Sequence, residues 1–269
     1  MKKTIRLFSA FLAVLSLSAC ENLGEKVDFN EGVRRQANYE ANTDKHLPTV
    51  NGYSTSLTVK ASGNKQSVTE SAKGTAAYDL DSVYFHSYAR ASVSVNGTSA
   101  SQDQDKYGFF NGGYFYDVQK TGNSAWAVSK AEMTKAEAKE YLIENYITTT
   151  TDLSSLSEGS IAAPDAKDEK SLTRYYTSMF DSSKTTYYSK GEGNLSFKTK
   201  FTYTAKGATA LPFTFTFSGT FDNYILTKMS MTGKFSQSGV SASISLSTKA
   251  THKCDVKYPN IGGLTFSTK

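Results

Sequence analysis

The chain has 269 residues and a formal net charge of +5, with 17 Tyr and 16 Phe against 4 Pro. Aromatic residues favour strands, and a body of this length suits one large domain rich in β-structure. Without Lys2, Lys3 and Arg6 the net charge falls to +2. That value argues against nucleic-acid binding, which needs a strongly basic surface. The two cysteines exclude a disulfide framework.

The N-terminus has the layout of a secretory signal peptide. The three cations precede an apolar run from Leu7 to Leu17, and the small residues Ser18 and Ala19 follow. The run is too short for the roughly 20 residues of a membrane-spanning helix. Leu17-Ser18-Ala19-Cys20 resembles the lipobox of bacterial lipoprotein precursors. In that class the cysteine sulfur receives a diacylglyceryl group, a reaction suited to a thiolate nucleophile, and cleavage leaves the cysteine at the N-terminus.

This resemblance implies a division of the chain. Residues 1–19 would be removed, Cys20 would carry the lipid and residues 20–29 would form a tether. The pattern of strands and helices described below predicts that residues 30–269 form a single half-barrel domain. We expect the protein to be lipid-anchored on the outer face of a bacterial membrane. That membrane is either the cell membrane or an outer membrane facing the periplasm. Cys254 then has no disulfide partner and is expected to be a small buried residue.

The first half of the body begins with a helix and continues with strands. Asn30 to Asp44 is predicted to be helical, with Asn30 as its N-cap. From Tyr53 the apolar period changes to two, and residues 83–95 alternate over a long strand. Ser62-Gly63-Asn64 and Asn96-Gly97 are predicted hairpin turns. Shorter strands are expected at 106–110, 113–118 and 124–129.

Helices are predicted in the middle of the chain, before strands resume. Ser129-Lys130-Ala131-Glu132 has the form of a capping box, which predicts a helix over 132–147. Pro164 to Phe180 again shows a helical period. Alternation then returns from Leu195 to Leu246, and a last strand is expected at 264–268.

These elements predict a mainly β (α+β) fold. The strands form one long antiparallel sheet with an apolar face and a Ser/Thr/Lys face. A sheet of such long strands has a concave apolar face to cover. We expect it to curl into an unclosed half-barrel whose concave face is covered by the helices between 130 and 182. Long alternating strands also occur in transmembrane β-barrels, but the lipobox, the mid-chain helix and the lysines of the polar face argue against one.

The order of elements resembles the superfamily of periplasmic lipoprotein carriers and lipid-carrying mycobacterial lipoproteins. The resemblance covers most of residues 30–269 and is carried by the alternation at 83–95, the aromatic segment from Tyr114 to Trp126, the helix at 132–147 and the strands at 195–250. It implies that an acyl chain or another hydrophobe binds between the sheet and the helices. A shared fold alone does not establish function.

Phenylalanine and methionine stripes are the candidate ligand-binding residues. They are Phe197, Phe201, Phe213, Phe215, Phe217, Met229 and Met231. Such adaptable apolar side chains suit a lipid-lined cavity. A core packed under the helices is the competing interpretation, and the two are compatible if the inner layers pack and the outer layers stay open.

Catalytic and metal-binding motifs are missing from the sequence. His46, His86 and His252 do not fall in a metal-ligand spacing, and neither a G-x-S-x-G motif nor a Gly-rich phosphate loop occurs. We therefore expect no enzyme, no cofactor and no metal site. Two functions stay open. One is a membrane-anchored envelope lipoprotein that binds or carries a lipid or other hydrophobe. The other is a structural or protein-interaction lipoprotein without a small-molecule ligand.

Overall fold

The computed structural model describes residues 23–147, 164–204, 212–237 and 239–262. The strands are β1 (Glu25–Val27), β2 (Val50–Gly63), β3 (Gln66–Asp79), β4 (Tyr84–Val95), β5 (Thr98–Asn111), β6 (Tyr114–Thr121), β7 (Ala127–Glu132), β8 (Thr186–Ser189), β9 (Leu195–Thr204), β10 (Pro212–Asp222), β11 (Ile225–Gln237) and β12 (Val240–Ala250). The helices are α1 (Phe29–Ala41), α2 (Thr43–His46), α3 (Lys135–Leu142), the π-helix η2 (Ile143–Ile147) and α4 (Glu169–Met179).

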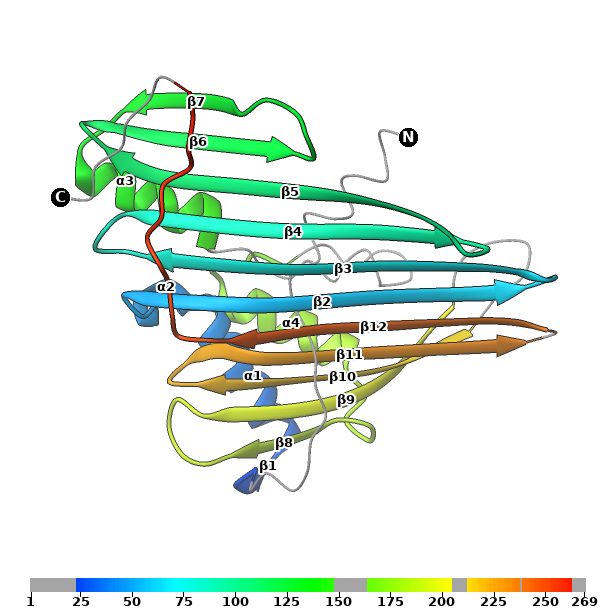
Figure 1. The fold of residues 1–269 in the computed structure, drawn as a ribbon. Coiled ribbons are helices and arrows are strands. Elements are labelled where there is room, and N and C mark those ends of the chain that lie inside the picture. Colours follow the sequence, from blue (N-terminus) through cyan, green and yellow to red (C-terminus); the bar gives the residue numbers. More distant parts are fainter. Residues whose placement is uncertain (1–22, 148–163, 205–211, 238, 263–269) are drawn as a thin grey trace.

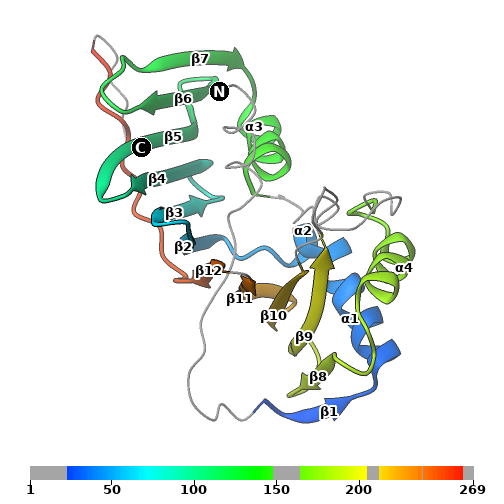
Figure 2. The ribbon, with the colours of Figure 1, turned by 90° about the vertical axis from the view of Figure 1, so that its right-hand side faces the viewer.

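The strands form a single antiparallel sheet of 12 strands in the order β1-β8-β9-β10-β11-β12-β2-β3-β4-β5-β6-β7. The meander β2–β7 and the meander β8–β12 join where β12 pairs with β2. β1 and β7 remain as two separate edges, so the sheet is not closed into a barrel. The sheet curls around the helices, which lie on its concave side (Figures 1 and 2). The predicted fold class, an unclosed half-barrel with helices on its concave face, is confirmed.

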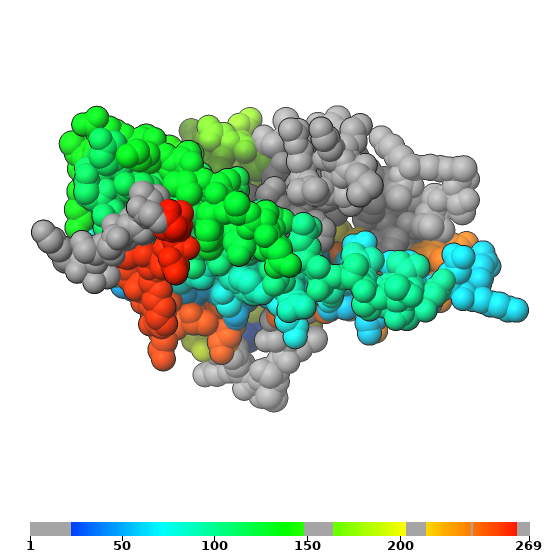
Figure 3. Space-filling view, turned by 45° about the horizontal axis from the view of Figure 1, so that its top comes forward, coloured from blue at the N-terminus to red at the C-terminus, as the bar shows by residue number. Residues whose placement is uncertain are grey.

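Tight turns connect the longest strands. Asn64 and Lys65 between β2 and β3, and Asn96 and Gly97 between β4 and β5, all have positive φ. Two successive positive φ values are typical of the turns that match the right-handed twist of paired strands. The turn at Asn96-Gly97 lies where it was predicted. The first turn lies slightly later than the predicted Ser62-Gly63-Asn64, because Ser62 and Gly63 still pair with β3. The hairpin ends of β2 and β3 project at the right-hand edge of the molecule (Figure 3).

The start of the folded body corrects the predicted tether at 20–29. Residues 25–27 form β1, which pairs with β8 at the edge of the sheet. The side chain of Asp28 then caps α1 by accepting hydrogen bonds from the amides of Asn30 and Glu31. Asp28 is therefore the N-cap in place of Asn30, because its carboxylate satisfies amides that the first helical turn leaves unpaired. The body begins at least five residues earlier than the predicted residue 30.

The predicted helix at 132–147 begins later than expected. Ser129 to Glu132 are the end of β7, where they pair with β6, so they form no capping box. Thr134 and Glu137 form it: the hydroxyl of Thr134 accepts from the Glu137 amide, and the Glu137 carboxylate accepts from the Thr134 amide. Both tetrapeptides fit the same motif, and strand pairing with β6 decides between them.

Two separate cores hold the helices on the sheet. α1 and α4 pack against β8–β12, with Val33 and Tyr176 among the buried helix residues. α3 and η2 pack against one end of β3–β6, where Tyr146 lies against Phe85 and Phe115. α4 begins at Glu169, after the predicted Pro164. Among the described residues, no helix is both long and apolar enough to cross a bilayer.

The C-terminal segment 251–262 lies across the outer face of the sheet, opposite the helices (Figures 1 and 2). The hydroxyl of Tyr84 donates a hydrogen bond of 2.7 Å to the carbonyl of Lys257. The ring of Tyr258 packs edge-on against Tyr84 at 5.9 Å. This segment covers a third, smaller core on the outer face. The strand predicted at 264–268 lies outside the described residues.

Candidate functional site on the inner face of the sheet

Strand alternation sends apolar side chains to the concave face, which we call the inner face. Residues in register form rows across the strands. One row runs through Phe217, Met231, Leu246, Leu57 and Ala72. Intervening Ser, Thr and Lys residues point to the convex outer face, as period-two strands require. This row therefore begins in the core under α1 and α4 and continues onto β2 and β3.

The predicted ligand-binding residues lie at the end covered by α1 and α4. Five of them are 2–6% exposed and belong to that core: Phe197, Phe215, Phe217, Met229 and Met231. Phe201 is partly exposed, and its ring stacks on that of Phe215 at 5.2 Å. Phe213 lies on β10, but its side chain is not among those that the structure describes. Cys20 lies outside the described residues. In the described structure the five buried residues are thus parts of a packed core.

Apolar side chains continue on the inner face next to that core, and Ile244 packs against it. On β12, β2, β3 and β4 the inner-face residues are mostly valine, alanine and isoleucine, and they are partly or fully exposed. We call this region the apolar strip: Val59, Ala61, Val68, Ala72, Ala91, Val93, Val95, Val240, Ala242 and Ile244.

The apolar strip is the feature of the inner face that points to a ligand. Val93, Val95 and Val240 are 37%, 46% and 39% exposed. Single exposed apolar residues need no explanation, but a contiguous patch marks an interaction surface. Alternate residues of 83–95, Val93 and Val95 among them, were predicted to lie on one face of the sheet. The ligand was placed at the Phe and Met stripes because those side chains are adaptable and apolar.

Among the described residues, one charged side chain lies between residues of the apolar strip on the inner face. Glu70 on β3 stands opposite Val59 on β2 and Val93 on β4, and it is partly buried. A carboxylate among valines loses hydration that a hydrogen-bond donor restores. This position can therefore hold a hydroxyl or ammonium group of a ligand whose apolar part lies on the strip.

A hydrogen-bonded network lies at the covered end. The hydroxyl of Tyr176 donates to Glu40 Oε2 at 2.5 Å, and the amide of Gln36 donates to Glu40 Oε1 at 3.1 Å. The hydroxyl of Tyr187 donates to Gln36 Oε1 at 2.9 Å. Desolvation raises the pKa of Glu40 to about 7, although the two hydrogen bonds act in the opposite direction. The network joins α1 to α4 and β8.

This network was missed in the sequence analysis. Gln36 and Glu40 fall one turn apart on the helix stripe that contains Val33, and this spacing was the available signal. Both oxygens of Glu40 already accept hydrogen bonds from the protein. The arrangement therefore holds α1 in place and resembles a structural network more than a catalytic pair.

Other chemistry-bearing residues are engaged elsewhere. Within the described ranges no group of three or more side chains could hold a metal ion. The imidazole of His86 is hydrogen-bonded to Asp105 at 2.6 Å on the outer face. Burial raises the pKa of the Cys254 thiol to about 11, which keeps it protonated and unreactive at neutral pH. Cys254 is partly buried beside the third core.

Comparison with known proteins adds little to this picture. No protein-family model and no curated protein matches the chain. Among solved structures, the chain is similar to a beta-barrel-like protein of a domain of unknown function, DUF1849, from Brucella abortus. The two are 10% identical with a TM-score of 0.27, and the match covers 77% of this chain and 100% of that one.

Proposed function

We propose that this chain is a lipid-anchored protein of the bacterial cell envelope whose inner face binds a lipid or another hydrophobic ligand. The exposed apolar strip carries the proposal. Its valines extend the rows of a packed core into solvent, so a ligand laid along them removes apolar surface from water. Such burial contributes about 25 cal/mol per Å². The membrane anchor would keep the protein next to a source of such ligands.

The residues of the strip suggest an amphiphile. The apolar part of the ligand would lie along β2–β4 against Val93 and Val95. Glu70 would accept a hydrogen bond from a hydroxyl or ammonium group of the same molecule, since its neighbours Val59 and Val93 offer it no donor through their side chains. A neutral or cationic head group would therefore be preferred to an anionic one.

The lipobox supports the anchored location. Leu17-Ser18-Ala19-Cys20 has the required residue types in the required order. β1 begins at Glu25, so only a few residues separate the proposed lipid on Cys20 from the folded body. An N-terminal cysteine with two or three acyl chains would hold the protein firmly on the membrane.

The second candidate is a structural or protein-interaction lipoprotein without a small-molecule ligand. The packed core favours it, because five predicted ligand-binding residues are 2–6% exposed. In this case the apolar strip would contact another protein. The two functions differ in whether the purified protein binds a small hydrophobe.

A matched pair of substitutions on β4 tests the proposal. Val93 and Ser94 are neighbours on opposite faces of the sheet. In the chain from Glu21 to Lys269, which contains every described residue, Val93→Asp should weaken binding of a fluorescent fatty alcohol at least about tenfold, because it adds a charge to the strip. Ser94→Asp should leave the affinity unchanged. Equal affinities in all three proteins, or no binding by the wild type, would contradict a ligand site on the strip.

A further inference from the structure

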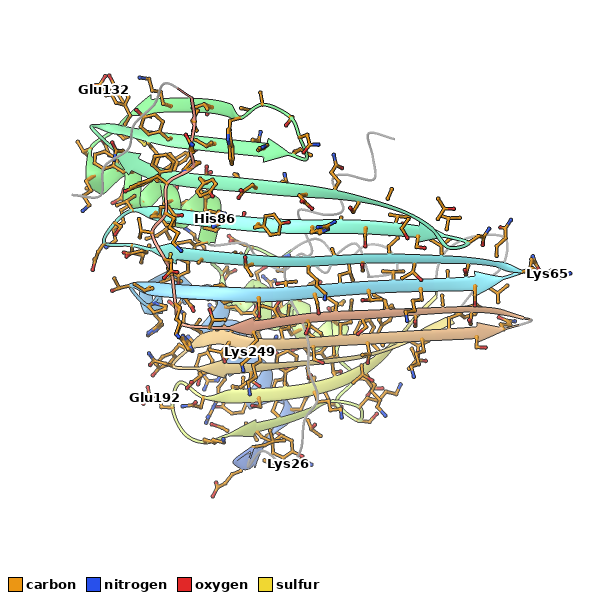
Figure 4. The ribbon with its side chains drawn as sticks, in the orientation of Figure 1. Lys26, Lys65, His86, Glu132, Glu192 and Lys249 are labelled. Atoms are coloured by element: carbon orange, nitrogen blue, oxygen red, sulfur yellow. The ribbon has the colours of Figure 1, made fainter. Side chains whose placement is uncertain are left out.

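The outer face of the sheet carries a patch of lysines. Four rows cross β9, β10, β11, β12, β2 and β3, and every described outward residue in them is Ser, Thr or Lys. We call this patch the lysine face: Lys60, Lys73, Lys198, Lys200, Lys228, Lys234 and Lys249. All except the half-buried Lys228 are exposed. Figure 4 views the sheet from this side and labels Lys249 on β12.

Carboxylates are missing from these four rows within the described residues. The nearest along β10 is Asp222, one step beyond the last row, at the end of the strand. The next strands along the outer face differ, since Arg90 on β4 lies 3.6 Å from Asp103 and His86 lies 2.6 Å from Asp105. Positive charge therefore accumulates on the part of the outer face formed by β9, β10, β11, β12, β2 and β3. On β4 and β5, carboxylates offset the positive charge. The small net charge of the whole chain hides this local excess.

We propose that the lysine face binds the surface of an anionic lipid bilayer. The lipid anchor on Cys20, which this proposal uses, belongs to the proposed function. β1 lies at the sheet edge beyond β8 and β9, and the five residues from Cys20 to Gly24 reach at most about 18 Å. A lipid on Cys20 would hold this edge against a membrane, with the lysine face beginning two strands away. Anionic head groups attract lysines within about one Debye length, roughly 10 Å at 0.1 M salt.

The layout of the lysines favours a surface over a linear polyanion. Strand spacing of about 4.8 Å and a two-residue repeat of about 6.6 Å give the patch dimensions of roughly 24 Å by 20 Å. The charges are spread over both dimensions, from Lys198 and Lys200 on β9 to Lys73 on β3. A linear polymer would follow a single track of cations. Ser and Thr hydroxyls between the lysines can donate hydrogen bonds to lipid phosphates.

Vesicle binding of the unanchored chain tests this proposal separately from the anchor. The probe is vesicles of phosphatidylglycerol mixed with phosphatidylcholine, with pure phosphatidylcholine as reference, and the protein is the chain from Glu21 to Lys269. One variant carries Lys→Gln at positions 60, 198, 200 and 249. A control carries Lys→Gln at 45, 135, 167 and 170, which are exposed residues of the helical side. Both variants lower the net charge by the same amount.

The lysine-face variant should bind anionic vesicles at least about tenfold more weakly, since each lysine near such a surface is worth about fivefold in affinity. The control should stay within about twofold of the wild type, and 1 M salt, where the Debye length is about 3 Å, should abolish binding. Equal losses in both variants, equal binding to pure phosphatidylcholine, or binding to soluble polyphosphate but not to vesicles would overturn the proposal. Whether Cys20 carries lipid is read independently from the mass of the full-length protein purified from membranes.

Discussion

The carboxyl of Glu40 should make the protein less stable as the pH rises through neutrality. Its pKa in the folded protein is about 7, above the ordinary 4.5 of an exposed glutamate. The folded state therefore holds the proton more tightly than the unfolded chain does. The stabilisation is complete below about pH 4.5 and is lost as the pH rises through 7. The gap between the two pKa values corresponds to about 3 kcal/mol of unfolding free energy.

Urea unfolding of the wild type and Glu40→Gln between about pH 4 and about pH 8 measures this effect. Glutamine keeps hydrogen-bonding groups for Tyr176 and Gln36 but never ionises. The two proteins should be equally stable at the acid end, and the variant should be more stable by up to about 3 kcal/mol at the alkaline end. A difference in stability that stays constant over this pH range would refute the reasoning.

Glu31 on the same helix provides a control of opposite sign. Hydrogen bonds from Arg34 and then Arg35 lower the pKa of Glu31 to about 2. Its contribution to stability is therefore present above the unfolded pKa of about 4.5 and is lost as the pH falls toward 2. Glu31→Gln should lower stability at neutral pH, by a small amount because Glu31 is 34% exposed and its partner Arg34 is 57% exposed. Its effect should shrink in acid.

Three further substitutions or treatments probe the cores. Phe217→Ala should lower the free energy of unfolding in denaturant by about 3–5 kcal/mol because Phe217 is 4% exposed. Phe201→Ala should lower it less because Phe201 is partly exposed. Equal losses in the two variants would contradict the packed core. Gly32→Ala should lower stability by about 1–3 kcal/mol because the new methyl would overlap the Tyr187 ring; a gain in Tm, which alanine gives in an open helix, would contradict that contact. In the chain from Glu21, native Cys254 should react with iodoacetamide at least about tenfold more slowly than in urea, since its pKa is about 11, and similar rates would show an accessible thiol.

Much of the sheet could be predicted because its strands are long and strictly alternating. In residues 83–95 mostly small or apolar residues alternate with tyrosine and polar residues, and in the strands between 195 and 246 apolar residues alternate with Ser, Thr and Lys. Both the strands and their faces therefore follow from the sequence. The turn at Asn96-Gly97 follows from the positive φ that these residues tolerate. The half-barrel with helices inside was predicted correctly from this pattern and from the resemblance.

The remaining features depend on contacts between distant segments. Ser129 to Glu132 and Thr134 to Glu137 fit the capping motif equally well locally, and pairing with β6 settles the choice. The path of residues 251–262 over the outer face depends on Tyr84, which lies far away in the sequence. The lysine face could not be seen in the sequence because its lysines come from five strands, two of them near the start of the body.

The central claim is that the inner face binds a hydrophobic ligand, and native mass spectrometry of the chain from Glu21 to Lys269 tests it most directly. The protein would be incubated with bacterial envelope lipids, separated from them and weighed, and the bound material would be extracted into solvent. The account predicts a reproducible mass excess that extracts as lipid and is lost in Val93→Asp but kept in Ser94→Asp. A bare protein mass after incubation, or an excess that all three proteins share, would contradict it.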